Sequence, residues 1–198
     1  ELYNAKKYTE AYEVTSSLLN KNQEGEDGFG HITYYMAITA LKVGKDDIAY
    51  KWFTLQANAY TIGLEEKNIT DEYFTYIDDL IYTFAAHYQN IGQYKQALKF
   101  HTIRLHFFKT YPSILTATDW AMANQNISVA FSSLKKFPEA FQHLSKAIEY
   151  ASDQPATLRY MRYQEVLLLA ESGDCDEFTK HSESDLVNDL PILNKKMI

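Results

Sequence analysis

Side chains that could do chemistry are few in this chain, and their spacing does not favour catalysis. The single cysteine, Cys175, follows Asp174 and precedes Asp176 and Glu177, and such acidic neighbours disfavour the reactive thiolate. The sequence contains no Gly-x-Ser-x-Gly motif, no glycine-rich phosphate loop and no His-Glu-x-x-His motif. We therefore expect a protein that is not an enzyme.

The histidines show no spacing typical of metal ligands. No two of them are three or four residues apart, the spacing that puts two ligands on one face of a helix. His101 and His106 are five residues apart, which turns them about 140° from each other on a helix. The alternative is a cluster of histidines that are distant in the sequence and come together only in the folded chain. From the spacing we expect no metal site and no cofactor.

A basic stretch stands out against the acidic chain. From Leu80 to Thr118 there is no acidic residue. Its cations are Lys95, Lys99, Arg104 and Lys109. On a helix over 94–110, the first three lie roughly on one side, where they could bind a carboxylate, a phosphate or an acidic segment. The alternative is a solvated face that balances the acidic residues of 171–198. Nucleic acid is not expected as a partner, because the whole chain has a net charge of −7.

Composition restricts the fold class. Of the 198 residues, 46% are hydrophobic and 23% are charged, so the chain can bury a core and is not typical of disordered proteins. Only 7 glycines and 4 prolines are present, too few for the many turns of an all-β fold. No apolar run approaches the ~18 residues of a membrane span, so we expect none in this region.

Internal repeats organise the chain. Four segments share an apolar stretch, a short turn and an alanine, with the alanines 38 to 48 residues apart, and in three of them an aromatic residue (Tyr8, Tyr94 or Phe137) stands three positions before the alanine. A weaker fifth copy ends near Phe178. Gly44, Gly92 and Gly173 mark places where a helix must stop, because glycine adopts positive φ at little cost. The alanines stand where two helices can cross closely: Ala11, Ala49, Ala97 and Ala140.

This pattern resembles the tetratricopeptide repeat. The third copy matches it at Ala85, Tyr88, Gly92, Tyr94, Ala97 and Pro112. The fourth copy matches it at Phe131, Phe137, Ala140, Ala147 and Pro155. The spacings exceed the ~34 residues usual for the family, and elongated copies are typical of its bacterial regulators. His101 and Arg104 also depart from the pattern, replacing an apolar and a small residue.

The resemblance implies an all-α, right-handed α-α superhelix, or solenoid, of about five helical hairpins over residues 1–178. Residues 179–198 are expected to form an edge or a linker of a longer protein. The periodicity predicts helices over 2–5, 8–22, 30–43, 46–62, 70–91, 94–110, 114–134, 137–151, 154–172 and 174–187.

The resemblance also implies a binding groove, because the first helix of each pair lines the concave side of such a solenoid. The expected lining is Tyr34, Tyr35, Lys42, Tyr82, Thr83, Asn90, Gln125, Asn126, Tyr163 and Gln164. Asn126 falls where the family often has an asparagine that bonds a peptide backbone. The family's carboxylate-clamping lysine is missing, since Asp79, Met122 and Tyr160 occupy its positions, and a co-chaperone role is therefore disfavoured.

These features together predict a non-catalytic module that binds a peptide or protein segment. The narrower hypothesis is the sensor or interaction region of a larger bacterial regulatory protein, in signalling or transcription regulation. The alternative is a structural array through which the parent protein self-associates, for example as a homodimer. The lone cysteine fits a reducing compartment, but both a cytoplasmic and an extracytoplasmic location stay open.

Overall fold

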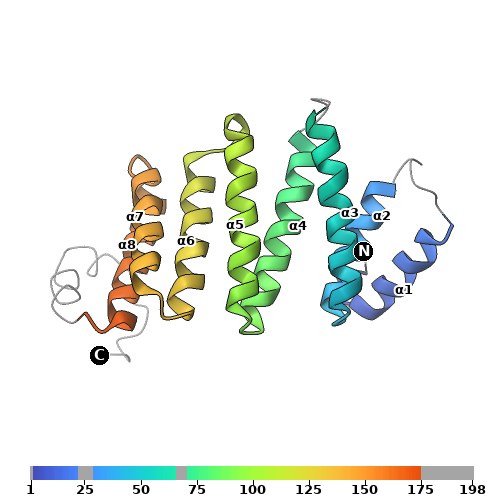
Figure 1. Cartoon of the computed structure of the whole chain (residues 1–198), viewed down its shortest axis with the longest axis horizontal. Coiled ribbons are helices and arrows are strands. Elements are labelled where there is room, and N and C mark those ends of the chain that lie inside the picture. The colour runs from blue at the N-terminus through green and yellow to red at the C-terminus, as the bar shows by residue number, and fades with distance from the viewer. Residues whose placement is uncertain (1, 22–28, 66–70, 175–198) are drawn as a thin grey trace. The chain divides into compact units, whose positions relative to one another are not determined.

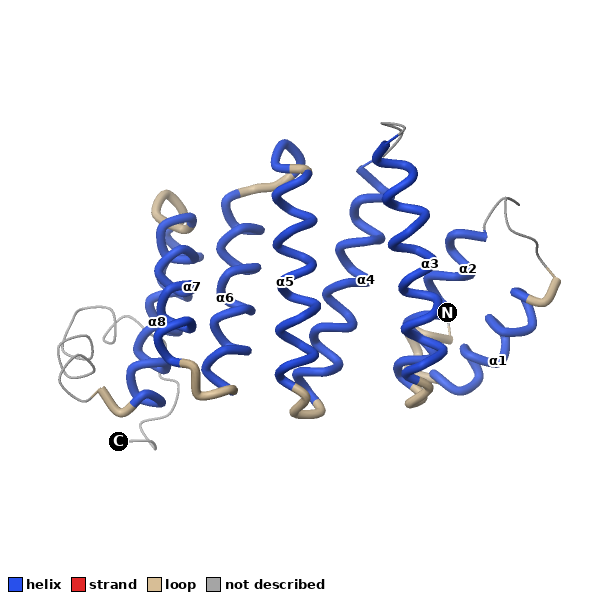
Figure 2. Tube along the Cα trace, in the orientation of Figure 1, coloured by secondary structure: helices blue, strands red, loops and turns tan. Residues whose placement is uncertain are grey.

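The computed structural model describes the backbone of residues 2–21, 29–65 and 71–174, and in these ranges it contains helices and no strand (Figures 1 and 2). One short 3-10 helix, η1, spans Pro112–Ile114. The α-helices are α1 Tyr8–Leu19, α2 Phe29–Lys42, α3 Asp46–Glu65, α4 Asp71–Asn90, α5 Tyr94–Thr110, α6 Ala117–Ser133, α7 Phe137–Tyr150 and α8 Pro155–Ser172. The expected all-α class is confirmed.

The helices form two compact units, Glu1–Ile91 and Gly92–Ile198. In the first unit α1 packs on α2, α2 on α3 and α3 on α4, and α2 also contacts α4. In the second unit α5 packs on α6, α6 on α7 and α7 on α8, and α6 also contacts α8. Each unit is therefore a stack of helical pairs in which the first helices of neighbouring pairs touch, as a solenoid requires.

The turns within the repeats have one backbone conformation in common. Gly44, Gly92 and Gly173 have φ of +75°, +76° and +78°, the left-handed region that glycine adopts without strain. Lys6 and Lys135 stand at the corresponding positions of the first and fourth copies, and both have φ of +58°. All five copies therefore turn in the same way, including the two that lack a glycine.

The small residues of the repeats are buried where helices cross. Ala49, Ala97 and Ala140 are fully buried, and Ala11 is 6% exposed. In the second unit Ala140 belongs to a core formed by α6, α7 and α8, together with Leu144, Ala147, Ala151, Met161 and Leu168. The repeat register deduced from the alanines is confirmed.

Several expected boundaries differ from the structure: α1 ends at Leu19 rather than at 22, and α3 continues to Glu65 rather than ending at 62. Residues 2–6 form a turn rather than the short helix expected over 2–5. The helix expected from 114 begins at Ala117, after η1, because Thr116 caps it: the Asp119 carboxylate accepts from the Thr116 amide at 2.8 Å, and the Asp119 amide donates to the Thr116 hydroxyl at 3.3 Å. The expected helix 174–187, past Asp174, and the segment 179–198 lie outside the described residues.

Candidate functional site

The expected lining residues all lie on the first helices of the pairs. Tyr34, Tyr35 and Lys42 are on α2, and Tyr82, Thr83 and Asn90 are on α4. In the second unit Gln125 and Asn126 are on α6, and Tyr163 and Gln164 are on α8. The placement on these helices agrees with the repeat register, and the binding role of these residues stays a prediction.

In the first unit, a group of aromatic rings joins α2 to α4. The Tyr34 hydroxyl donates a hydrogen bond to the Asp79 carboxylate. The Tyr34 ring lies 5.5 Å from that of Tyr76, and the His31 ring lies 4.9 Å from Tyr76 at 84°. Tyr35 contacts Tyr34 with ring centres 5.2 Å apart. We call these five residues, His31, Tyr34, Tyr35, Tyr76 and Asp79, the tyrosine–aspartate cluster.

The cluster lies at the surface rather than in the core. Tyr35 is 42% exposed, His31 and Asp79 are exposed, and Tyr34 is half-buried. Burial, followed by the hydrogen bond to Asp79 and its charge, raises the pKa of Tyr34. The phenol therefore keeps its proton and remains the donor, and Asp79 remains the acceptor.

The other expected residues of this unit extend the surface beyond the cluster. Asp79, Tyr82 and Asn90 lie on one exposed stripe of α4, and Tyr82 is 43% exposed. Lys42 is exposed two turns beyond Tyr35 on α2, close to His87. Burial lowers the pKa of His87, with Asp46 opposing that shift and Lys42 adding to it.

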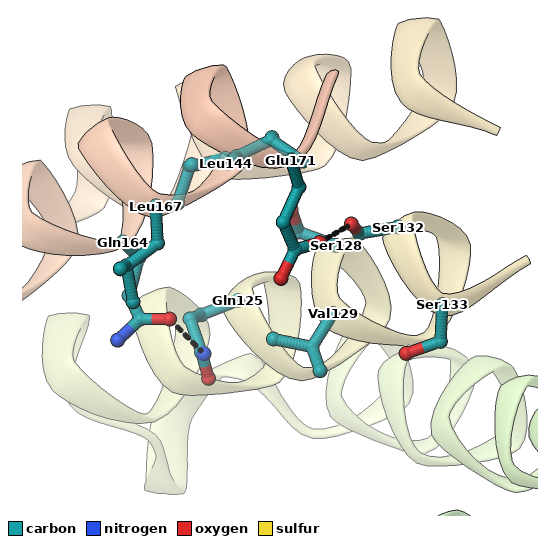
Figure 3. Close-up of a pocket in the computed structure, with 10 residues that line it drawn as sticks. Gln125, Ser128, Val129, Ser132, Ser133, Leu144, Gln164, Leu167 and Glu171 are labelled. Atoms are coloured by element: carbon teal, nitrogen blue, oxygen red, sulfur yellow. Dashed lines mark hydrogen bonds between the residues drawn. The ribbon is translucent and has the colours of Figure 1, made fainter. Parts of the chain in front are cut away.

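In the second unit, a half-open cleft of about 150 Å³ lies between α6, α7 and α8 (Figure 3). The Gln125 amide nitrogen donates to the Gln164 amide oxygen at 3.3 Å, so two expected ligand-binding residues bond to each other. The Ser132 hydroxyl donates to the Glu171 carboxylate. The lining residues are Gln125, Ser128, Val129, Ser132, Ser133, Leu144, Gln164, Leu167, Leu168 and Glu171.

Asn126 lies beside this cleft and not in its lining. It belongs to the half-buried stripe of α6 with Met122, Val129 and Ser133, of which the last two line the cleft. Within the described part of the chain, its amide forms no hydrogen bond. Its neighbour Asn124 behaves differently: it is 2% exposed, donates to the Trp120 carbonyl at 2.9 Å and bonds His143 at 3.1 Å.

The basic residues of α5 divide between two faces. Lys95, Lys99 and Lys109 lie on its exposed stripe, together with Thr102 and His106. Arg104 is half-buried instead, with its guanidinium 4.9 Å from the centre of the Phe108 ring. The expectation that Arg104 shares a side with Lys95 and Lys99 is therefore wrong, because five residues from Lys99 turn it by about 140°.

The histidine that departs from the repeat pattern is a core residue. His101 is 2% exposed on α5. Burial, and to a smaller extent Arg104, lowers the pKa of His101 to about 4. Sequence reasoning identified the departure but could not tell its position in the core, since exposed and buried histidines look alike in a single sequence.

Two features of the described ranges bear on the chemistry of the site. Among residues 2–21, 29–65 and 71–174, no three or more His, Cys, Asp or Glu side chains come together as metal ligands would. In the same ranges no helix has both the length and the apolar character needed to span a membrane. Cys175 and His181 lie outside the described residues.

Comparisons with known proteins agree with the helical pairs. The tetratricopeptide repeat family model matches residues 1–21 and 79–101. A crystal structure of nearly identical TPR-like repeats, from a Podosopora anserina protein assigned as a kinesin light chain, has a TM-score of 0.62 at 12% identity, and the match covers 92% of this chain and 87% of that one. The crystal structure of BtubC (BKLC) from P. vanneervenii has a TM-score of 0.61 at 16% identity, covering 98% of this chain and 74% of that one. No curated protein matches the sequence.

At these identities the solved structures show the fold alone, and that fold is a helical solenoid. Tetratricopeptide repeats generally mediate protein–protein interaction, and the fold is typically a non-catalytic scaffold. The two matched segments coincide with repeat turns that the structure describes, at Lys6 and Gly92. The chain thus has tetratricopeptide-like repeats in the two matched segments, and its fold is that of an all-α helical solenoid.

Proposed function

We propose that this chain binds an extended peptide or protein segment along the accessible faces of the first helices of its pairs. The observation that carries the proposal is the exposure of large amphipathic side chains there: Tyr35 is 42% and Tyr82 is 43% exposed. Tyrosine offers a partner apolar area and a polar tip while losing little conformational entropy. Packing in the core does not account for these two tyrosines, because other residues of the same helices fill the core.

The second unit supports the same function with different groups. Asn126 carries an amide that both donates and accepts, and this matches the two polar groups of a peptide bond. The adjoining cleft is lined by Val129, Leu167 and the Gln125–Gln164 pair, in which Gln125 is only 4% exposed. A bound backbone would therefore meet polar and apolar contacts in the same place.

The narrower part of the proposal is the biological setting. We place the chain as the sensor or interaction region of a larger bacterial regulatory protein, acting in signalling or transcription regulation. The support is the repeat spacing of 38 to 48 residues, longer than the family's ~34. This part concerns the parent protein and is independent of whether the faces bind peptide.

The binding experiment selects linear peptides from a displayed random library against the purified chain. The affinity of each selected peptide is then measured for the parent, for Tyr35→Ala and for the control Gln142→Ala, an exposed position on the second helix α7. Asn126→Ala is measured in the same way, and we expect Tyr35→Ala or Asn126→Ala to weaken binding by about fivefold or more while Gln142→Ala has no effect. Failure to select any peptide, or equal losses in all variants, would contradict the proposal.

Self-association is the second candidate, and one observation favours it. Val14 and Leu18 are one turn apart on α1 and are 49% and 42% exposed, so this helix carries accessible apolar area. A contact between two copies of the chain needs accessible apolar area of this kind. Light scattering over a range of protein concentrations tests this candidate. Val14→Lys should abolish any dimer that the unmodified chain forms. If the unmodified chain stays monomeric at high concentration, self-association is ruled out.

A further inference from the structure

The tyrosine–aspartate cluster combines one carboxylate with several ring faces at the surface of the first unit. Asp79 is exposed and accepts one hydrogen bond, from the Tyr34 hydroxyl. A carboxylate offers about four acceptor positions, so Asp79 retains capacity for a further donor. Within the described residues, Asp79 forms no ion pair with a lysine or arginine of this chain.

The rings around this carboxylate stand at steep angles to one another. Tyr76 meets His31 at 84° and Tyr34 at 66°, and Tyr34 meets Tyr35 at 83°. Tyr35 also contacts the Tyr3 ring at 6.2 Å, yet it is 42% exposed, and His31 is exposed, so these two rings are partly accessible to a partner. The negative face of a ring attracts a cation within about 6 Å of its centre. The cluster therefore offers a carboxylate and ring faces together, both of which attract positive charge.

The acidic residues of the chain are distributed unevenly along its sequence. Residues 1–91 contain 14 acidic and seven basic residues, and residues 92–198 contain 12 of each. The first segment thus carries the whole net charge of −7. The closest lysine on the cluster's own helices, Lys42, lies two turns beyond Tyr35, where it acts on His87. The exposed carboxylate of Asp79 would itself attract a cationic group of a partner and repel an acidic one.

We infer that the tyrosine–aspartate cluster binds an arginine side chain of the partner segment, with the guanidinium paired to Asp79 and stacked against the tyrosine rings. Arginine fits better than lysine, because its planar fork bonds a carboxylate in two places and stacks on aromatic faces. This assignment rests on the proposed function, since it names the chemistry of the segment that binds there. A site of this kind would prefer a positively charged partner. The family's carboxylate clamp prefers a negatively charged one, because it has a lysine at the position that Asp79 occupies here.

A positional-scanning library tests the inference directly. Each pool of linear peptides has one fixed residue in an otherwise random background, and binding to the full chain is measured by fluorescence anisotropy. We expect pools with a fixed arginine to bind at least tenfold more tightly than pools with a fixed glutamate, and lysine pools to fall between them. Raising the salt concentration should reduce this difference, because the contribution is electrostatic.

Two variants distinguish a specific site at Asp79 from a general effect of negative charge in the same unit. Asp79→Asn removes the charge and keeps an oxygen that can accept from Tyr34, so the fold should be unaffected, as a thermal melt would verify. Glu13→Gln is the matched control, since Glu13 is exposed on α1 and its replacement removes one negative charge elsewhere in the same unit. We expect Asp79→Asn to remove the arginine preference and Glu13→Gln to preserve it.

The outcomes distinguish this inference from the function on which it rests. If peptides bind but arginine pools are not favoured, or if Asp79→Asn keeps the preference, the arginine site is wrong and peptide binding stands. If Glu13→Gln reduces the preference as much as Asp79→Asn, the preference comes from the overall field, and the site is again wrong. If no pool binds, both proposals fail.

Discussion

Lys135 stands in its repeat turn where Gly92 stands in the repeat before it, and both residues have positive φ, +58° and +76°. The turn after α6 therefore keeps a left-handed residue although the sequence supplies a side chain. A residue with a Cβ in this region is strained by about 1 kcal/mol or more. The packing of α6 on α7, which places Ala140 in the core, holds the turn in this conformation.

Replacing Lys135 by glycine should stabilise the chain by roughly 0.5–1 kcal/mol, because the relief of strain exceeds the added flexibility of the unfolded state. Urea denaturation measures this difference. The matched control is Gly92→Ala, which should destabilise by about 1 kcal/mol through φ alone, since a Cβ at Gly92 would meet nothing within 4 Å. A destabilised Lys135→Gly would show that the lysine side chain contributes more than the strain costs.

Ala140→Glu should destabilise the second unit by several kcal/mol. Ala140 is fully buried between helices, and the variant would force a carboxylate without a partner into that space. Ala97→Glu should behave alike, because Ala97 is buried to the same degree. Thermal melts compare both with Gln142→Glu, an exposed change on α7 that should leave the melting temperature within a degree or two. Unchanged melts for the alanine variants would contradict the repeat register.

Asn126→Ala should leave the melting temperature nearly unchanged, because its amide forms no hydrogen bond within the described residues. Binding of a selected peptide should weaken by roughly 1–3 kcal/mol, the loss when a backbone group of the peptide is left without its partner. Asn124→Ala is the contrasting variant: Asn124 is buried and bonds both Trp120 and His143, so its loss should lower stability. A stability loss at Asn126 without a binding defect would remove it from the site.

Acid should destabilise the chain through His101. Burial lowers the pKa of His101 to about 4 in the folded state, while an unfolded histidine has a pKa near 6.5. Between these values the unfolded state binds more protons, so the free energy of unfolding falls as pH decreases, by about 3 kcal/mol from this residue between roughly pH 7 and 4. Urea denaturation at several pH values should show a shallower decrease for His101→Leu than for the parent. Parallel curves for the two proteins would contradict the assignment.

The sequence alone determined the repeat register and with it most of the fold. The glycines and alanines could be interpreted because each meets a local requirement, positive φ at Gly92 or a close crossing at Ala97, that few other residue types satisfy. The start of α6 could also have been found, since Thr116 and Asp119 have the spacing of a capping box. The apolar residues Ile114 and Leu115 favour an earlier start, whereas the cap at Thr116 places both before the helix.

Only the tertiary structure decided which side chains meet. Tyr34 and Asp79 are 45 residues apart, and Gln125 and Gln164 are 39 apart, so their hydrogen bonds depend on how neighbouring pairs stack. A single sequence contains no signal for such pairs, because their geometry comes from the packing of α2 on α4 and of α6 on α8. The same holds for Lys135, whose positive φ is imposed by the helices on either side of the turn rather than by its own preference.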